Sequence, residues 1–290
     1  MRIVVSKSPA VVVRPSEPVT PATRKINLSP FDKPFSIIPI NVLLAFDHSI
    51  NEPVEIIRKS LSQALVHYYP IAGRFAGDDY NDLHIDYTGN DDEGGVTFVA
   101  ASADCTINDL LRDIDGRSPD PSTALLHELL VDYPASMMSF SHADPLLLMQ
   151  VTAFSCGGFV IGVTWNHGIA DGFGIAQFLQ AVGDLTRGMP APAVVPVRWD
   201  TSTQQVTGYE SVLFLTCWRN IGFERVDFGC GGEGTTPMRV MTVHKQSLVR
   251  PTCVVCLPCK CEEGGGGARV LSSCVTAHHS DAFLREIATL

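Results

Sequence analysis

The stretch "PLLLMQVTAFSCGGFVIGVTWNHGIADGFG" (residues 145–174) holds two apolar runs followed by a turn rich in glycine. The segment "SCGG" at residues 155–158 separates the runs and has the small, flexible residues typical of a tight connection. Strands that are buried on both faces read as nearly continuous apolar runs. The stretch therefore predicts a hairpin of two largely buried strands, which leads into a loop that carries His167.

A helix is predicted directly after this loop, over residues 172–188 ("GFGIAQFLQAVGDLTRG"). Gly188 and Pro190 are typical of a helix end. Asp171 precedes the first turn, where a carboxylate is favoured by free backbone amides and by the positive end of the helix dipole. The apolar residues at helical spacing are Ile175, Phe178, Leu179 and Val182.

The rest of the chain also mixes strands with helices, which indicates an α/β or α+β protein. We expect a buried strand at residues 40–49, a helix at 51–70 that is capped by Asn51 or Glu52, and two short strands within 82–100. Further strand-like runs lie at residues 211–217, 238–243, 252–257 and 268–275, and a closing helix starts near Ser280.

A domain boundary is predicted at "MPAPAVVPVRWDTSTQQVTG", because this segment is rich in proline and polar residues. We therefore divide the chain into an N-terminal domain at residues 1–190, a linker at 191–208 and a C-terminal portion at 209–290. The first of these domains carries His167.

The composition indicates an ordinary soluble globule, with 45% hydrophobic and 18% charged residues. The net charge of −10, without a cluster of Lys and Arg, argues against a nucleic-acid partner. There is no run of 18 apolar residues that could span a membrane, and the N-terminus lacks the continuous apolar core of a signal peptide. We therefore expect a cytoplasmic protein whose nine cysteines are free thiols.

His167 is the candidate catalytic residue, because it lies between a strand and a helix, where sites are commonly built. Gly168, Gly172 and Gly174 have no side chains that would keep a ligand from the imidazole. A histidine and an aspartate at this spacing can easily occur by chance in a chain of this length and composition. A buried histidine bonded to the backbone, with Asp171 acting only as a helix cap, is therefore an alternative.

Other chemistries fit the sequence less well. The chain has neither the G-x-S-x-G of a serine hydrolase nor the H-E-x-x-H of a zinc protease. Gln177 stands where a dinucleotide-binding loop would need its third glycine. A metal-binding module is a further alternative, but the segment that would form it reads equally well as a strand, and we predict no metal site. Its cysteines are Cys253, Cys256, Cys259 and Cys261.

Several of these segments resemble the BAHD family of plant acyltransferases, which use acyl-CoA donors. "NHGIADGFG" (residues 166–174) resembles the family's H-x-x-x-D-G motif, and "VDFG" (226–229) resembles the start of its D-F-G-W-G signature. "LSQALVHYYPIAGR" (61–74) and "WRNIGFERVDFG" (218–229) are also similar, especially to cereal members that acylate amines such as tryptamine.

Two features depart from the family pattern. Cys230 replaces the tryptophan of D-F-G-W-G, and His167 and Asp227 are only 60 residues apart, much closer than in family members. The resemblance therefore implies an α/β protein with the two-domain, chloramphenicol-acetyltransferase-like fold of mixed sheets and flanking helices, in which the second domain is largely incomplete. The internal loss lies near residues 199–211. The family's arginine partner for the motif aspartate lies in the part that is absent.

The resemblance also implies an activity, the transfer of an acyl group from acyl-CoA to a hydroxyl or amine of a plant specialised metabolite. His167 would be the general base, and Asp171 would orient its loop. The segment formed by Asp227, Phe228 and Gly229 would brace the domain interface without contacting substrate. Acyl-CoA would be a cosubstrate, with no permanently bound cofactor, no obligate protein partner and a monomeric state.

The alternative from another class is an inactive family member, either a binding protein or a non-functional product, because half of the two-walled substrate channel is missing. Loss of much of one domain also leads us to expect loose packing after about Trp199. His167 would then be unusually open to solvent on the donor side.

Overall fold

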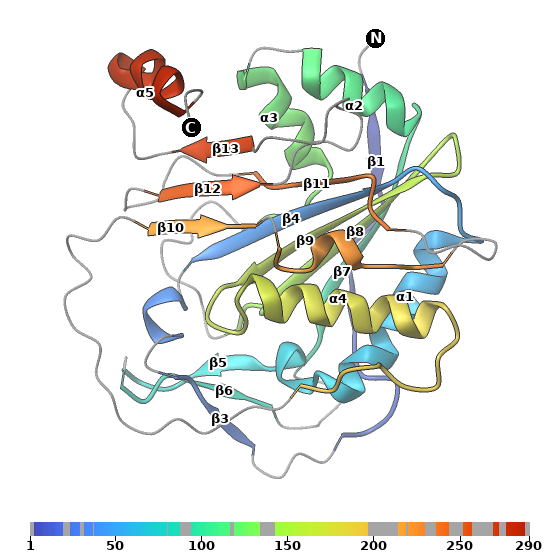
Figure 1. Ribbon diagram of the computed structural model, residues 1–290. Coiled ribbons are helices and arrows are strands. Elements are labelled where there is room, and N and C mark those ends of the chain that lie inside the picture. Colours follow the sequence, from blue (N-terminus) through green and yellow to red (C-terminus); the bar gives the residue numbers. More distant parts are fainter. Residues whose placement is uncertain are drawn as a thin grey trace.

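The computed structural model is built around one mixed sheet, with helices on both of its faces (Figure 1). We describe residues 3–19, 24–29, 32–36, 38–79, 81–87, 94–116, 119–133, 143–196, 214–218, 220–229, 236–243, 252–256, 269–272 and 277–287. Within these ranges no helix is both long and apolar enough to cross a membrane.

The main sheet has seven strands. Its order is β1 (Val5–Lys7), β7 (Val96–Ala103), β8 (Leu147–Phe154), β9 (Phe159–Asn166), β4 (Pro39–Phe46) and β11 (Arg239–Met241), and β2 (Val11–Val13) also pairs with β7. Among the strand pairs of this sheet that the structure describes, β7–β8 alone is parallel. Strands β8 and β9 form the predicted buried hairpin, which is thereby confirmed.

Two smaller sheets accompany the main sheet. One contains β3 (Lys25–Asn27), β6 (His84–Asp86) and β5 (Arg74–Ala76), and the other contains β10 (Phe214–Cys217), β12 (Thr252–Cys256) and β13 (Arg269–Ser272). The two strands expected within residues 82–100 are present as β6 and β7, but they belong to different sheets.

The helices are α1 (Pro53–His67), α2 (Ile107–Gly116), α3 (Pro119–Glu128), α4 (Gly172–Thr186) and α5 (Ser280–Ile287). Short 3₁₀ turns occur at η1 (Lys33–Phe35), η2 (Tyr69–Ala72), η4 (Phe223–Arg225) and η5 (Ala277–His279). The predicted helices correspond to α1, α4 and α5. Glu52 occupies the N-cap position of α1, but its side chain accepts no capping hydrogen bond. Helices α2 and α3 were not predicted.

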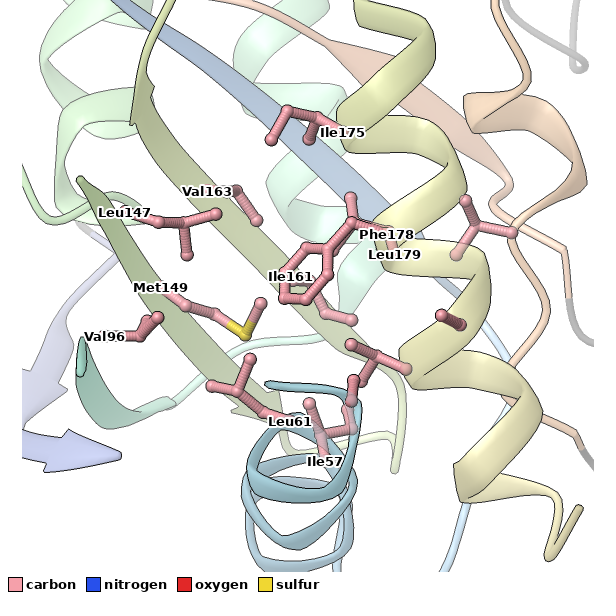
Figure 2. Close-up of a cluster of buried hydrophobic side chains, with 14 of the residues drawn as sticks. Ile57, Leu61, Val96, Leu147, Met149, Ile161, Val163, Ile175, Phe178 and Leu179 are labelled. Carbon is pink, nitrogen blue, oxygen red and sulfur yellow. The ribbon is translucent and has the colours of Figure 1, made fainter. Parts of the chain in front are cut away.

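The larger core lies between the sheet and helices α1 and α4 (Figure 2). Figure 2 shows Ile57 and Leu61 of α1 and Phe178 of α4 pointing toward Met149 of β8 and Ile161 of β9. All five side chains are fully buried. A second cluster lies on the other face of the sheet and includes residues of α2. The hairpin is therefore covered on both faces, as its continuous apolar runs require.

Described residues between Trp218 and Val243, beyond the predicted linker, are part of the core, which corrects our expectation of loose packing for this part of the chain. For the residues after Val243 the expectation stays a prediction. Strand β11 pairs with β4, and Phe223, Val226 and Phe228 are almost completely buried in the larger core. The division at residues 191–208 stays a prediction, since residues 197–213 lie outside the described ranges.

Candidate active site

His167 directly follows β9 and lies against the segment that precedes β4. Its backbone N–H donates to the carbonyl of Ile38 at 2.9 Å. The imidazole also contacts the Phe35 ring, with centroids 5.0 Å apart and planes tilted by 34°. One side of the histidine is thus supported by residues that lie more than a hundred positions earlier in the chain.

Burial favours the neutral form of this imidazole. His167 is partly buried, and its openness to solvent on the donor side stays a prediction. Removal from water lowers the pKa of His167 below 6.5, while a backbone hydrogen bond and the carboxylates of Asp171 and Asp32 raise it by less. The net direction is downward, so the imidazole is neutral at pH 7.

The loop that carries His167 is closed by side chains of the two residues before it. The indole N–H of Trp165 donates to the carbonyl of Ala170 at 3.0 Å. The side-chain oxygen of Asn166 accepts from the N–H of Gly168 at 2.8 Å, and its amide nitrogen donates to the carbonyl of Ser36. Sequence reasoning missed these residues, although an asparagine side chain commonly bonds the backbone two residues further along, as in an Asx-turn.

Asp171 caps helix α4, as predicted. One of its carboxylate oxygens accepts from the N–H of Gly174 at 2.8 Å, and its backbone carbonyl accepts from Ile175. Within the part of the chain that the structure describes, no lysine or arginine pairs with Asp171. The contacts shown are therefore those of a helix cap beside the histidine loop.

The loop glycines allow other parts of the chain to approach. A Cβ atom on Gly168 would lie 2.8 Å from the Cα atom of Ser36, and one on Gly172 would lie 2.7 Å from the end of the Ile221 side chain. A Cβ on Gly174 would lie 2.9 Å from that of Ala170. Their role in a substrate channel stays a prediction.

Asp227, Phe228 and Gly229 lie at the far end of α4 from His167. Arg187, the C-cap residue of α4, donates to the backbone carbonyl of Asp227 and lies 3.5 Å from its carboxylate. Gly229 has a φ of 77°, and its N–H donates to the Asp227 carboxylate at 2.8 Å. The structure therefore does not bring this segment together with His167, because α4, a helix about 22 Å long, lies between them.

The structure describes only some of the cysteines on which the metal-site and free-thiol predictions rest. The described residues contain no group of three or more His, Cys, Asp or Glu side chains arranged to hold a metal ion. Cys230, Cys259 and Cys261 lie outside those residues. Where thiols are described, Cys105, Cys156 and Cys217 are free.

Comparison with known proteins decides the family. The sequence model of a family described as "Transferase family" matches residues 3–210. Acyl transferase 15 of rice (Oryza sativa subsp. japonica) is 36% identical over an alignment of 442 residues that takes in 100% of this chain and 99% of the rice protein. The chain belongs to the BAHD acyltransferase family. Because it has 290 residues, this BAHD chain lacks a long internal stretch present in the rice protein, as predicted.

The BAHD chain is also similar to another plant acyltransferase and to a solved structure. Benzyl alcohol O-benzoyltransferase of Petunia hybrida is 42% identical over 146 residues, which are 50% of this chain and 29% of that enzyme. The crystal structure of vinorine synthase superposes with a TM-score of 0.66 at 16% identity, over 92% of this chain and 94% of that one. This superposition confirms the expected chloramphenicol-acetyltransferase-like fold.

Proposed function

We propose that this chain transfers an acyl group from acyl-CoA to a hydroxyl or amine of a plant specialised metabolite, with His167 as the general base. The acceptor would give its proton to the neutral imidazole as it attacks the thioester carbonyl. The tetrahedral intermediate would then collapse, releasing CoA as the thiolate, which takes up a proton. A positioned base typically contributes about 10²–10⁴-fold to the rate of such a step.

The observation that carries this proposal is the state of His167. Only a neutral imidazole accepts a proton, and burial lowers the pKa of His167 so that this form is favoured further at neutral pH. The residue also directly follows β9, every residue of which is buried. The petunia relative, by its name, acylates an alcohol, which supports a hydroxyl acceptor.

Asp171 would keep the start of α4 in place, and Asp227, Phe228 and Gly229 would brace the far end. Asp171 binds a backbone N–H within its own turn. Phe228 is almost completely buried and Asp227 is bound to Arg187. These contacts support roles in holding the loop and the core rather than in proton transfer.

The test is thiol release by the purified chain. Acetyl-CoA and benzoyl-CoA would each be supplied with benzyl alcohol or tryptamine, and the products would be identified by mass spectrometry. We expect release that depends on the acceptor and is abolished by His167→Ala. His127→Ala is the matched control, because His127 is also a partly buried histidine beside a carboxylate, 2.9 Å from Asp132.

Two results would contradict the proposal. If His167→Ala kept the turnover of the wild-type chain, His167 would not be the base. If the folded wild-type chain neither released thiol nor bound CoA, it would be the inactive family member that is the alternative.

A further inference from the structure

Asn166 is completely buried at the end of β9 and links two parts of the chain. Its side-chain oxygen accepts from the N–H of Gly168, just after the histidine. Its amide nitrogen donates to the carbonyl of Ser36, 130 positions earlier. The first of these bonds therefore joins Asn166 and Gly168, the two sequence neighbours of His167.

The segment that receives the second bond also supports the imidazole. Phe35, whose ring contacts His167, directly precedes Ser36. Ile38, whose carbonyl accepts from the His167 N–H, lies two positions beyond Ser36. The hydrogen bond from Asn166 to Ser36 therefore ties the histidine loop to the segment that contacts the imidazole ring and accepts from the His167 N–H.

We propose that Asn166 is a positioning residue for His167, which uses one buried amide to fix the histidine loop against the segment that contributes Phe35, Ser36 and Ile38. This rests on the proposed function in so far as His167 is the general base. Replacement of the amide leaves a buried N–H and a buried carbonyl without a partner, so the loop would move to recover hydrogen bonds. Displacement of a reacting group by about 1 Å can cost about 10²-fold in rate.

The first test does not depend on activity. The pKa of His167 would be measured by NMR titration of histidine-labelled protein, with His167→Gln used to assign its signal among the nine histidines. The charged groups that act on this imidazole are Asp171, at the start of α4, and Asp32, just before η1. We expect a wild-type pKa below 6.5 and a rise toward 6.5 in Asn166→Ala, because a released loop admits water.

Two further variants make the comparison specific. Asn166→Ser retains a hydroxyl that can accept from the N–H of Gly168 but does not reach Ser36, so a smaller rise is expected. Asn41→Ala is the matched control. Asn41 is also a buried asparagine that binds backbone, donating to the Val243 carbonyl at 2.6 Å and accepting from its N–H at 2.7 Å. Its loss should leave the pKa of His167 unchanged.

The second test is kinetic. In Asn166→Ala we expect kcat to fall by about 10- to 100-fold while KM changes by less than about threefold, since a displaced base affects the chemical step more than binding. Asn41→Ala should retain the kcat of the wild-type chain.

The proposal is overturned if Asn166→Ala shows the wild-type pKa of His167, or if Asn41→Ala shifts it equally. If Asn166→Ala does not fold, Asn166→Ser decides by the same criteria. A wild-type chain without activity would overturn the proposed function instead, and the titration would still decide the role of Asn166.

Discussion

The ring of Phe228 lies edge-on against the ring of Phe46, with centroids 5.4 Å apart and planes at 87°. Phe46 is the last residue of β4 and also stacks on Phe159 of β9, at 4.6 Å. The second family signature therefore packs against the two strands that position the histidine loop. Although it lies far from His167 along α4, it belongs to the same core.

This packing predicts a large loss of stability for Phe228→Ala. Removal of a fully buried phenylalanine costs about 3–5 kcal/mol, because apolar transfer energy is lost and a cavity is left. Urea denaturation would measure the change. Phe173→Ala is the control, because Phe173 is 58% exposed and its loss should alter stability by less than about 0.5 kcal/mol. Equal effects of the two substitutions would mean that Phe228 is not buried in the core.

The lowered pKa of His167 predicts a pH dependence of stability. As pH falls through 6.5, the unfolded chain takes up a proton at this residue before the folded chain does. Protonation therefore favours unfolding, and stability is lost between pH 6.5 and the lower pKa of the folded state. We expect His167→Gln to lose less stability than the wild-type chain over this interval, as measured by melting temperature. An unchanged pH profile would argue against a buried, neutral imidazole.

The cap on α4 predicts different effects for two substitutions of Asp171. Asp171→Ala removes the hydrogen bond to the Gly174 N–H and should cost about 0.5–2 kcal/mol of stability. Asp171→Asn retains an acceptor and loses only the charge at the positive end of the helix, which is worth about 0.3–1 kcal/mol. Thermal melts of both variants would check this order. If Asp171→Asn melts like the wild-type chain yet abolishes turnover, the carboxylate has a chemical role.

Two loop glycines should respond differently to alanine. In Gly168→Ala the new methyl group would meet backbone, the Cα of Ser36 at 2.8 Å, so the segment beside His167 would have to move. In Gly172→Ala it would meet only the tip of the Ile221 side chain, which can rotate. We expect Gly168→Ala to reduce thiol release by at least about tenfold, and Gly172→Ala to reduce it much less. Similar losses would show that backbone contact at Gly168 is unimportant.

Local features of the sequence were enough to predict the elements around the site. The hairpin, α4 and the cap at Asp171 follow from apolar runs, helical spacing and a carboxylate at a helix start, all of which involve near neighbours. Helix α2 could have been found in the same way. Thr106 and Asp109 bond to each other's backbone N–H groups there, at 3.1 and 3.2 Å, in a capping box that is visible as T-x-x-D.

The supports of His167 were not predictable in this way, because they depend on which strands pair and in what register. Pairing of β4 with β9 places Pro39 opposite Asn166, and this brings Ser36 within reach of the Asn166 amide. Likewise, pairing of β11 with β4 and burial of Phe228 unite parts of the chain that the sequence suggested were separate. Contacts between such distant residues leave no periodic pattern in the sequence. The sequence alone therefore determined the histidine and its loop, whereas the tertiary structure decided what holds the imidazole in place.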